Sequence, residues 1–137
     1  MSELNALMRR GIVPPLLHGI LDYPLALVLI VLPLVLSFDD TAAKWIAFAF
    51  GVGAAVLAVA TAWQTSIVRI IPPLLHGYTD IAVTIALIVL PFIIGFSQHK
   101  TALVFYVVVG AAGLVATLAT RFPGRAEPHR MAVQMAA

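Results

Sequence analysis

Two histidine–aspartate pairs are the residues of this sequence whose types and spacing could perform chemistry. His18 precedes Asp22 by four residues, and His76 precedes Asp80 by the same interval. In a helix this spacing places both side chains of a pair on one face. An imidazole beside a carboxylate can transfer protons near neutral pH, bind a metal or a haem iron, or form a polar contact between helices. These four residues are therefore the candidate site.

The pairs admit three interpretations. The one we favour is structural: each aspartate holds its histidine in one tautomer, and the pairs bond across the helices. In the second, the pairs handle protons or ions at the cytoplasmic mouth of a membrane bundle. In the third, His18 and His76 are cofactor-binding residues that hold a metal or a b-type haem, each oriented by its aspartate. The first interpretation needs no cofactor and no metal, and haem b is the alternative.

The composition excludes several classes of protein. Hydrophobic residues make up 62% of the 137 residues and charged residues 10%, whereas a soluble domain carries about 25% charged residues. So few charges cannot cover a surface that faces water, so the bilayer must solvate much of the chain. There is no cysteine, which excludes disulfides, thiolate metal sites and cysteine nucleophiles. We find no phosphate-binding glycine loop and no nucleophile motif; we therefore lean against an enzyme and assign no catalytic residue.

The chain contains an internal repeat that includes both pairs. Residues 12–38 and 70–96 are identical at 14 of 27 positions, and the two histidine–aspartate pairs occupy matching places. With one inserted residue, the segments that follow also align: Gly51 with Gly110, Thr61 with Thr120 and Trp63 with Phe122. A repeat of this length predicts a fold built from two equivalent units.

Each repeat holds two apolar stretches that are long enough to cross a membrane. We place these spans near residues 14–37, 42–63, 72–96 and 101–121. A helix needs about 20 residues to cross the hydrocarbon core, and open sheets do not occur in lipid. Thr41 is a candidate cap for the second span, and Gly51 and Gly110 are expected to let helices pack closely. We predict an all-α membrane protein, a four-transmembrane-helix bundle made of two parallel-topology helical-hairpin repeats.

Prolines mark the beginning and the interior of the first and third spans. Pro14-Pro15 and Pro72-Pro73 suit the first turn of a helix, where the missing N–H is not needed. Pro33 and Pro91 lie inside the spans, where a proline frees a carbonyl oxygen and bends the helix axis. We therefore predict helix kinks at Pro33 and Pro91.

The chain divides into five parts. They are a cytoplasmic N-terminal segment at 1–11, the first two-helix repeat at 12–63, a cytoplasmic linker at 64–71, the second two-helix repeat at 72–121 and a mobile cytoplasmic tail at 122–137. Leu4, Leu7 and Met8 have helical spacing, so the N-terminal segment can form a short helix at the membrane interface.

Positive charges predict the orientation in the membrane. One side of the bundle holds Arg9, Arg10, Arg69, Arg121, Arg125 and Arg130, whereas the other holds only Lys44 and Lys100. Because positive residues concentrate on the cytoplasmic side, we expect both termini in the cytoplasm of a multi-pass protein of the cell membrane. The formal charge of +2 is small, which argues against a nucleic-acid partner.

The aspartates lie too deep in the spans to face lipid. Asp22 is about 12 Å along the helix from Pro14, and an aspartate facing lipid at mid-membrane costs about 2.5–3.5 kcal/mol. We therefore expect the first and third spans to meet with Asp22 and Asp80 turned inward. Trp45 and Trp63, near span ends, fit an aromatic belt at the membrane interface.

The repeat resembles a known family. Each copy has a proline step late in its first helix, Leu32-Pro33-Leu34 and Leu90-Pro91-Phe92, followed by Ser37-Phe38 or Gly95-Phe96. This arrangement resembles the SPW-repeat family of prokaryotic membrane proteins, which has two transmembrane helices per repeat and a Ser-Pro-Trp step in the first. The resemblance covers roughly residues 12–121. It implies the duplicated-hairpin architecture and a prokaryotic cell membrane, and it implies no particular activity.

These observations predict a small integral membrane protein that is a structural or accessory component of the membrane. The alternative function is a haem-, metal- or proton-handling module that uses the two His-x3-Asp pairs. The expected partner is the lipid bilayer, with a homodimer or a larger membrane complex as the protein partner.

Overall fold

The computed structural model describes residues 2–123 of the chain and consists, over those residues, of helices without strands. The helices are α1 (Ser2–Arg9), α2 (Pro15–Val35), α3 (Thr41–Ala60), α4 (Pro73–Ile94) and α5 (Lys100–Ala119). Helices α2 to α5 are each long and apolar enough to cross a membrane, with mean hydropathy between 1.9 and 2.3. The prediction of an all-α, multi-pass membrane protein is confirmed. Residues 124–137 of the predicted tail lie outside the described residues.

The starts of the membrane helices follow from their local sequence. Helices α2 and α4 begin just after Pro14 and Pro72, as the paired prolines predict. The prediction that Thr41 caps α3 is wrong, because Thr41 is already the first helical residue. The cap is Asp40, whose carboxylate accepts a hydrogen bond from the Ala43 N–H at 2.7 Å. Asp40 lies in extended backbone, which turns its side chain back toward the free amides of the first turn.

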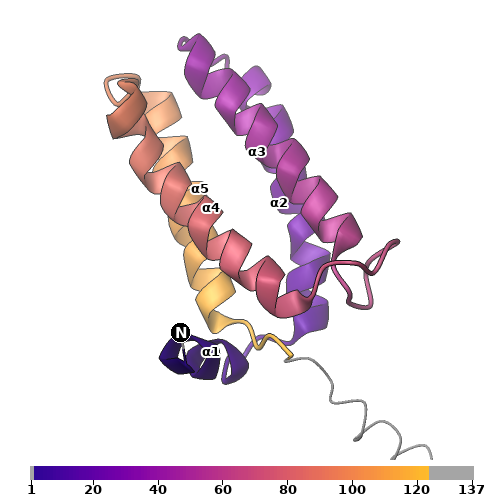
Figure 1. Ribbon diagram of the computed structural model, residues 1–137. Coiled ribbons are helices and arrows are strands. Elements are labelled where there is room, and N and C mark those ends of the chain that lie inside the picture. The colour runs from indigo at the N-terminus through magenta and orange to yellow at the C-terminus, as the bar shows by residue number, and fades with distance from the viewer. Residues whose placement is uncertain (1, 124–137) are drawn as a thin grey trace, which may run out of the picture.

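Each repeat folds as a tight hairpin, α2 with α3 and α4 with α5 (Figure 1). Glycines make the close packing possible. A Cβ atom on Gly51 would lie 2.9 Å from the Ala26 carbonyl oxygen of α2, and one on Gly110 would lie 2.9 Å from the Thr84 carbonyl oxygen of α4. Gly51 and Gly110 are equivalent positions in the repeats, so both hairpins use the same backbone contact, as expected for helices in lipid.

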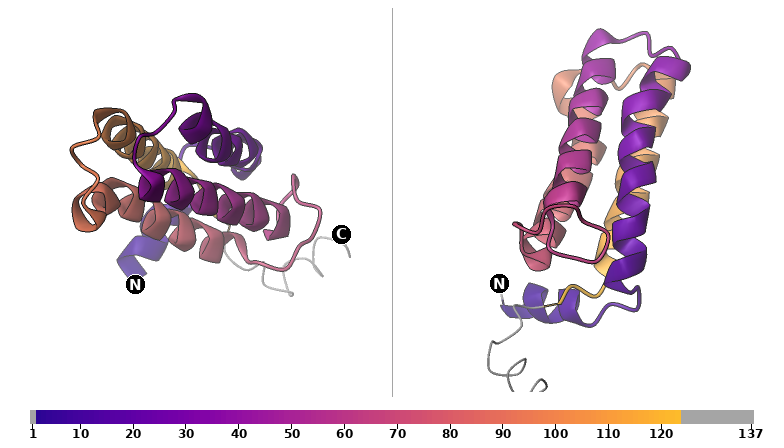
Figure 2. Two further views of the ribbon diagram at one scale, coloured as in Figure 1. Left: turned by 90° about the horizontal axis from the view of Figure 1, so that it is seen from above. Right: turned by 90° about the vertical axis from the view of Figure 1, so that its right-hand side faces the viewer.

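The two hairpins lie side by side (Figures 1 and 2). They share one apolar core that includes a residue of each loop. This core takes residues from all four long helices and from both loops: Leu29, Phe38, Ala43, Ala47, Leu87, Phe96, Ala102, Phe105 and Tyr106. The Tyr106 hydroxyl of α5 donates to the Ala43 carbonyl oxygen of α3 at 2.6 Å. This bond crosses from one hairpin to the other, and it satisfies a hydroxyl that is fully buried.

At the opposite end, each hairpin finishes beside the beginning of the other. The Ala62 N–H donates to the Ile71 carbonyl oxygen at 2.8 Å, and the Arg121 N–H donates to the Val13 carbonyl oxygen at 2.9 Å. These two contacts occupy equivalent positions in the two repeats, and each forms a short parallel bridge. The end of each hairpin is thus bonded to the start of the other. This reciprocal contact is consistent with two parallel repeats related by a pseudo-twofold axis.

Helix α1 lies across this closed end (Figure 1; Figure 2, right). Met8 of α1 is fully buried with Trp63 and Phe122, and the Phe122 N–H donates to the Met8 carbonyl oxygen at 2.7 Å. The prediction that Trp63 belongs to an interfacial aromatic belt is wrong, because only 6% of its surface is exposed. Trp45 is 57% exposed, consistent with such a belt. Residues 2–9 form a helix, as their apolar spacing predicts, and Met8 packs against the end of the bundle. The place of this helix at the membrane interface stays a prediction.

We expect Gly51→Ala to destabilise the protein and Gly53→Ala to leave it unchanged. The added methyl group at Gly51 meets the backbone of α2, whereas a Cβ on Gly53 meets nothing within 4 Å. Overpacking of this kind costs about 1–3 kcal/mol. Thermal unfolding in detergent, followed by circular dichroism, measures the difference. Equal melting temperatures for the two variants would contradict the close contact between α2 and α3.

Candidate functional site

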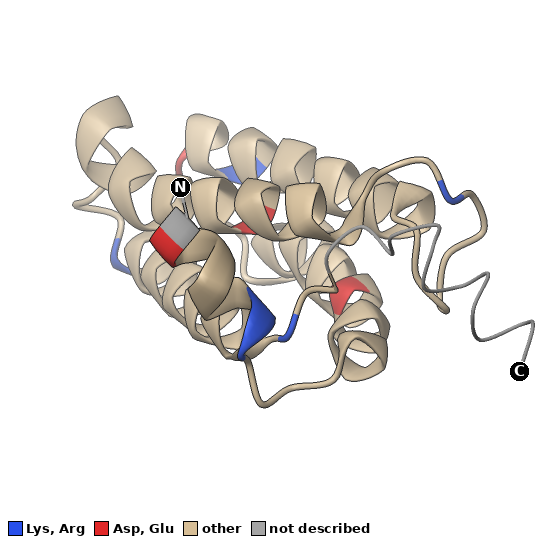
Figure 3. Cartoon of the chain, turned by 60° about the horizontal axis from the view of Figure 1, so that its bottom comes forward, with Lys and Arg blue, Asp and Glu red and all other residues tan. Residues whose placement is uncertain are grey.

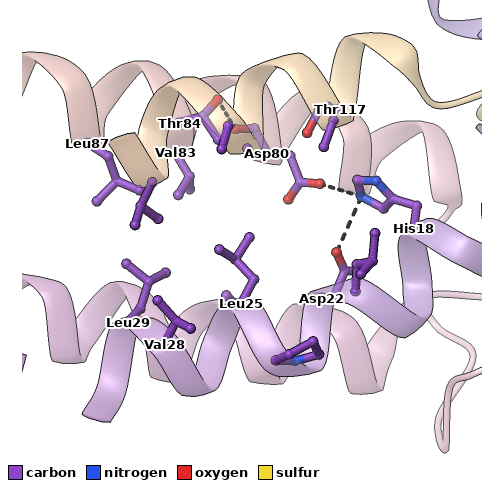
Figure 4. A pocket seen from close by; sticks show the side chains of 17 residues that line it. His18, Asp22, Leu25, Val28, Leu29, Asp80, Val83, Thr84, Leu87 and Thr117 are labelled. Atoms are coloured by element: carbon purple, nitrogen blue, oxygen red, sulfur yellow. Dashed lines mark hydrogen bonds and ion pairs between the residues drawn. The ribbon is translucent and has the colours of Figure 1, made fainter. Parts of the chain in front are cut away.

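The four predicted side chains meet between α2 and α4, near the end of the bundle that α1 covers. The Nε2 atoms of His18 and His76 each lie 3.0 Å from Asp80 Oδ2. His18 Nε2 also lies 3.4 Å from Asp22 Oδ1, and His76 Nε2 lies 3.4 Å from Asp22 Oδ2. We call these four residues the His–Asp cluster. Each histidine contacts the carboxylates of both repeats, so the inward orientation of Asp22 and Asp80 is confirmed (Figure 4 shows His18 with both).

The cluster is buried and carries no lysine or arginine. His76 is 1% exposed, His18 5% and Asp22 8%, while Asp80 is partly buried. Among the described residues, every ion pair formed by these two carboxylates is with a histidine. Figure 3 shows that lysines and arginines lie in α1, in loops and near helix ends. Two carboxylates thus share an apolar setting with only two imidazoles to balance them.

The second nitrogen of each histidine contacts a threonine that matches between the repeats but was not predicted to belong to the site. His76 Nδ1 lies 2.7 Å from Thr61 Oγ1, and His18 Nδ1 lies 2.9 Å from Thr120 Oγ1. Both threonines are fully buried. Each histidine is bound by the threonine of the other repeat, so these contacts also cross between hairpins. The matching positions of the two threonines in the repeat could have pointed to them. Only the folded chain shows that each threonine bonds to the histidine of the other repeat.

The threonines determine where the hydrogen atoms of the histidines lie. The hydroxyl of Thr61 donates to the Leu57 carbonyl oxygen at 2.6 Å, and that of Thr120 donates to the Ala116 carbonyl oxygen at 2.7 Å. A hydroxyl has one hydrogen and a carbonyl oxygen only accepts, so each hydroxyl oxygen must accept from the neighbouring Nδ1–H. Each neutral imidazole then presents an Nε2 lone pair to the carboxylates. Lone pairs that face each other repel, so the cluster requires hydrogens or a cation between them.

Aromatic rings and glycines enclose the histidines. The ring centre of Trp63 lies 4.4 Å from that of His76 and 5.6 Å from that of His18, and the Phe122 ring lies 5.3 Å from that of His18. Gly19 leaves room for Trp63, because a Cβ atom there would lie 3.2 Å from the indole nitrogen. Gly77 plays the same part beside Phe122 in the second repeat. The rings exclude water from one side of the cluster.

A cavity of about 330 Å³ adjoins the other side of the cluster (Figure 4). His18, Asp22 and Asp80 line one end of it, while the remaining walls are mostly apolar side chains of the four membrane helices. The labelled apolar neighbours in Figure 4 are Leu25, Val28, Leu29, Val83 and Leu87. The cavity leaves space for a small molecule beside three of the four polar side chains.

The two prolines predicted to kink the helices lie away from the cluster, at the ends of α2 and α4. Pro33 and Pro91 are both buried. Their own carbonyl oxygens accept hydrogen bonds at the helix ends, from the Phe38 N–H at 3.2 Å and from the Gly95 N–H at 3.3 Å. Both prolines thus occupy the last turns of their helices, and the kinks stay a prediction.

We expect hydrogen to reside on Nδ1 of both cluster histidines, and to lose that preference in Thr61→Val and Thr120→Val. Valine has the shape of threonine but offers no oxygen to accept the Nδ1–H. Nitrogen-15 NMR of labelled protein distinguishes protonated from unprotonated imidazole nitrogens, and His99, which is outside the cluster, provides the internal control. An unprotonated Nδ1 at His76 in the unmodified protein would contradict the proposed hydrogen-bond directions.

Comparison with known proteins gives one match. The family model for the SPW repeat domain matches residues 16–120, which include all four membrane helices apart from the first residue of α2. A search among curated proteins found no match, and neither did a search among solved structures. The matched segment contains the His–Asp cluster and both threonines that hold it, and it covers most of the chain. The duplicated-hairpin membrane protein described here belongs to the SPW repeat family.

Proposed function

We propose that the protein is a structural or accessory component of the membrane in which the His–Asp cluster joins the two hairpins. The observation that carries this proposal is the crossed pattern of contacts. Each carboxylate contacts the histidines of both repeats, and each histidine bonds to the threonine of the other repeat. Without the cluster, the described hairpins would be held together by the apolar core near the loops, the Tyr106 bond and the backbone bridges.

Lipid makes such a joint more important than it would be in water. Apolar side chains gain little by leaving lipid for another helix, so association depends on close packing and on polar contacts. If the hairpins separated, the imidazoles and carboxylates would meet hydrocarbon, where polar groups without partners are costly. The bilayer is thus the first partner of this chain. As an accessory component it would meet a second copy or a larger complex within the membrane.

The haem alternative fits the geometry poorly. A porphyrin held by His18 and His76 would have to lie between their Nε2 atoms. That space contains the carboxyl oxygens of Asp22 and Asp80, which lie 3.0–3.4 Å from the same two nitrogens. Both carboxyl groups would have to leave before a flat ring could enter. A single ion, in contrast, can use the carboxylates as ligands.

A second candidate function is therefore the binding of a cation, and one specific observation favours it. Two buried atoms of the cluster, His76 Nε2 and Asp22 Oδ2, have no hydrogen-bond partner among the described residues. Buried polar atoms are nearly always paired, so two orphans in one cluster indicate a missing ligand or hydrogen atom. A proton would fill the same place, which keeps the proton-handling interpretation as a variant of this candidate.

The orientation that we propose places both termini and the linker in the cytoplasm of a prokaryotic cell, because arginines concentrate at that end. The chain has no cysteine, so single cysteines report accessibility without background. We expect Gln98→Cys to react with a membrane-impermeant thiol reagent in intact cells, and Gln64→Cys to react only after the membrane is opened. The reverse pattern would contradict the orientation.

We expect Asp80→Ala to loosen the joint between the hairpins. Asp80 is the carboxylate nearest to both histidines, at 3.0 Å from each. Its loss removes the hydrogen-bond partner of His18 Nε2 and the nearest carboxylate of His76, at a cost of about 1–3 kcal/mol. Thermal unfolding in detergent measures this loss. Spin labels on Thr41→Cys and Thr101→Cys, at the starts of α3 and α5, should show a broader range of distances between the hairpins.

The matched control is Asp39→Ala, which removes an exposed carboxylate from the loop between α2 and α3. We expect its melting temperature and label distances to equal those of the unmodified protein. If Asp80→Ala behaves like Asp39→Ala in both measurements, the cluster does not join the hairpins.

A further inference from the structure

The His–Asp cluster is incomplete as the protein alone builds it. His76 Nε2 is 3.0 Å from Asp80 Oδ2 but lacks hydrogen-bond geometry toward it, and Asp22 Oδ2 accepts no hydrogen bond from a described residue. His76 is 1% exposed and Asp22 8%. Both atoms point into the cluster from opposite repeats, so one group placed between them would satisfy both. Such a group must interact with an imidazole nitrogen and a carboxylate oxygen at the same time.

We propose that the cluster binds one divalent first-row transition-metal ion of the Zn²⁺ type, with His18, Asp22, His76 and Asp80 as its four ligands. This inference rests on the proposed role of the cluster as the joint between hairpins, since the ion would complete that joint. One ligand atom from each residue lies within 4.8 Å of the other three. Two ligands come from each repeat, so only the assembled bundle forms the site.

The spacing of the ligand atoms fits tetrahedral coordination. Bonds from zinc to histidine nitrogen and carboxylate oxygen are about 2.0–2.2 Å long, which separates neighbouring ligand atoms by about 3.3–3.6 Å. Both histidine Nε2 atoms lie 3.0 Å from Asp80 Oδ2. From Asp22 they are 3.4 Å away, His18 Nε2 from Oδ1 and His76 Nε2 from Oδ2, so a small rotation of this carboxylate turns one oxygen toward both. Since no pair of ligand atoms is more than 4.8 Å apart, the widest pair closes by at most about 1.5 Å around an ion. Side-chain rotation can supply that movement.

The histidines are already prepared as metal ligands. A histidine that binds a metal through one nitrogen usually donates the hydrogen on its other nitrogen to a fixed acceptor, which sets the tautomer and the direction of the ring. Thr61 and Thr120 provide that acceptor, and each hydroxyl is itself fixed by a backbone carbonyl oxygen one turn earlier. Both Nε2 lone pairs therefore point at the same place. A contact that served only to join helices would not need this direction.

The ligand types and the charge select the class of ion. Calcium and magnesium prefer oxygen ligands alone, whereas two imidazoles with two carboxylates suit zinc, manganese, iron and their neighbours. Two carboxylates balance the two positive charges of the ion, so the occupied site is neutral. Neutrality matters in an apolar setting, where an unbalanced charge is costly. No lysine or arginine of the described residues competes for the carboxylates.

The test is metal binding by the full chain in detergent, with any affinity tag removed and bound metal stripped by a chelator. Titration with Zn²⁺ should show one ion per chain, measured by calorimetry and by elemental analysis after gel filtration. Co²⁺ should bind competitively and give the strong visible absorption of tetrahedral cobalt. Both ions should raise the melting temperature, because they bind the folded chain alone.

The variants separate these ligands from the other metal-binding side chains. His76→Ala and Asp22→Ala should abolish the high-affinity site. Thr61→Val, which keeps all four ligands, should weaken binding by about 10–100-fold, the usual cost of losing a group that orients a ligand. The control is the double variant His99→Ala with His129→Ala, which removes the only other histidines of the chain and should bind like the unmodified protein.

Three results would overturn the proposal. They are no stoichiometric binding of Zn²⁺ or Co²⁺, binding that survives His76→Ala, and binding lost in the His99→Ala, His129→Ala control. If His76→Ala fails to fold, the Thr61→Val titration decides, since an unchanged affinity would overturn the assignment. The joint is judged separately: if Asp80→Ala loosens the hairpins in the metal-stripped protein and no stoichiometric binding of Zn²⁺ or Co²⁺ is found, the joint stands and the metal site is refuted.

Discussion

Two carboxylates buried among apolar helices are the constraint on which this structure depends. Neither Asp22 nor Asp80 can face the acyl chains without a large cost, and neither has a lysine or arginine among the described residues to pair with. The only stable place for them is against the two histidines, and that place exists only where α2 and α4 meet. The position of the hairpins relative to each other follows from this requirement and from the shared core at the opposite end.

Duplication of the hairpin turns one weak motif into a complete site. A single hairpin would carry one histidine, one aspartate and one threonine, and its histidine would lack the threonine that the structure shows it to use. Two copies around a pseudo-twofold axis exchange these groups, so that Thr61 serves His76 and Thr120 serves His18. The backbone bridges at Thr61 and Thr120 cross in the same way. The site therefore lies between the repeats and takes two of its four residues from each.

The two ends of the bundle are held together by different kinds of contact. Near the loops, large side chains such as Phe96 and Tyr106 are buried in the apolar core that the hairpins share. At the end that α1 covers, polar groups make the contacts, and Met8, Trp63 and Phe122 shield them from one side. A cavity remains between these regions. The cluster is thus enclosed by aromatic rings in one direction and open to a small space in the other.

Sequence alone determined the elements of this protein, because each rests on a local property. Span length, paired prolines and the repeat placed the four long helices, and the resemblance in the proline steps identified the SPW repeat family. The depth of Asp22 was enough to predict that it faces Asp80. Two predictions failed because of neighbouring residues. Asp40 caps α3 in place of Thr41, and Trp63 packs beside Gly19 inside the bundle in place of joining an interfacial belt.

Only the tertiary structure decided which groups touch. The spacing of His18 and Asp22 indicates a shared helix face, yet the shortest contact of His18 in the cluster is with Asp80, 62 residues away. The role of Thr61 and Thr120 has no local signal at all, because each lies at the end of one hairpin and binds a histidine at the start of the other. Such contacts depend on the rotation and separation of whole helices, which are set by packing across the bundle and not by any one segment.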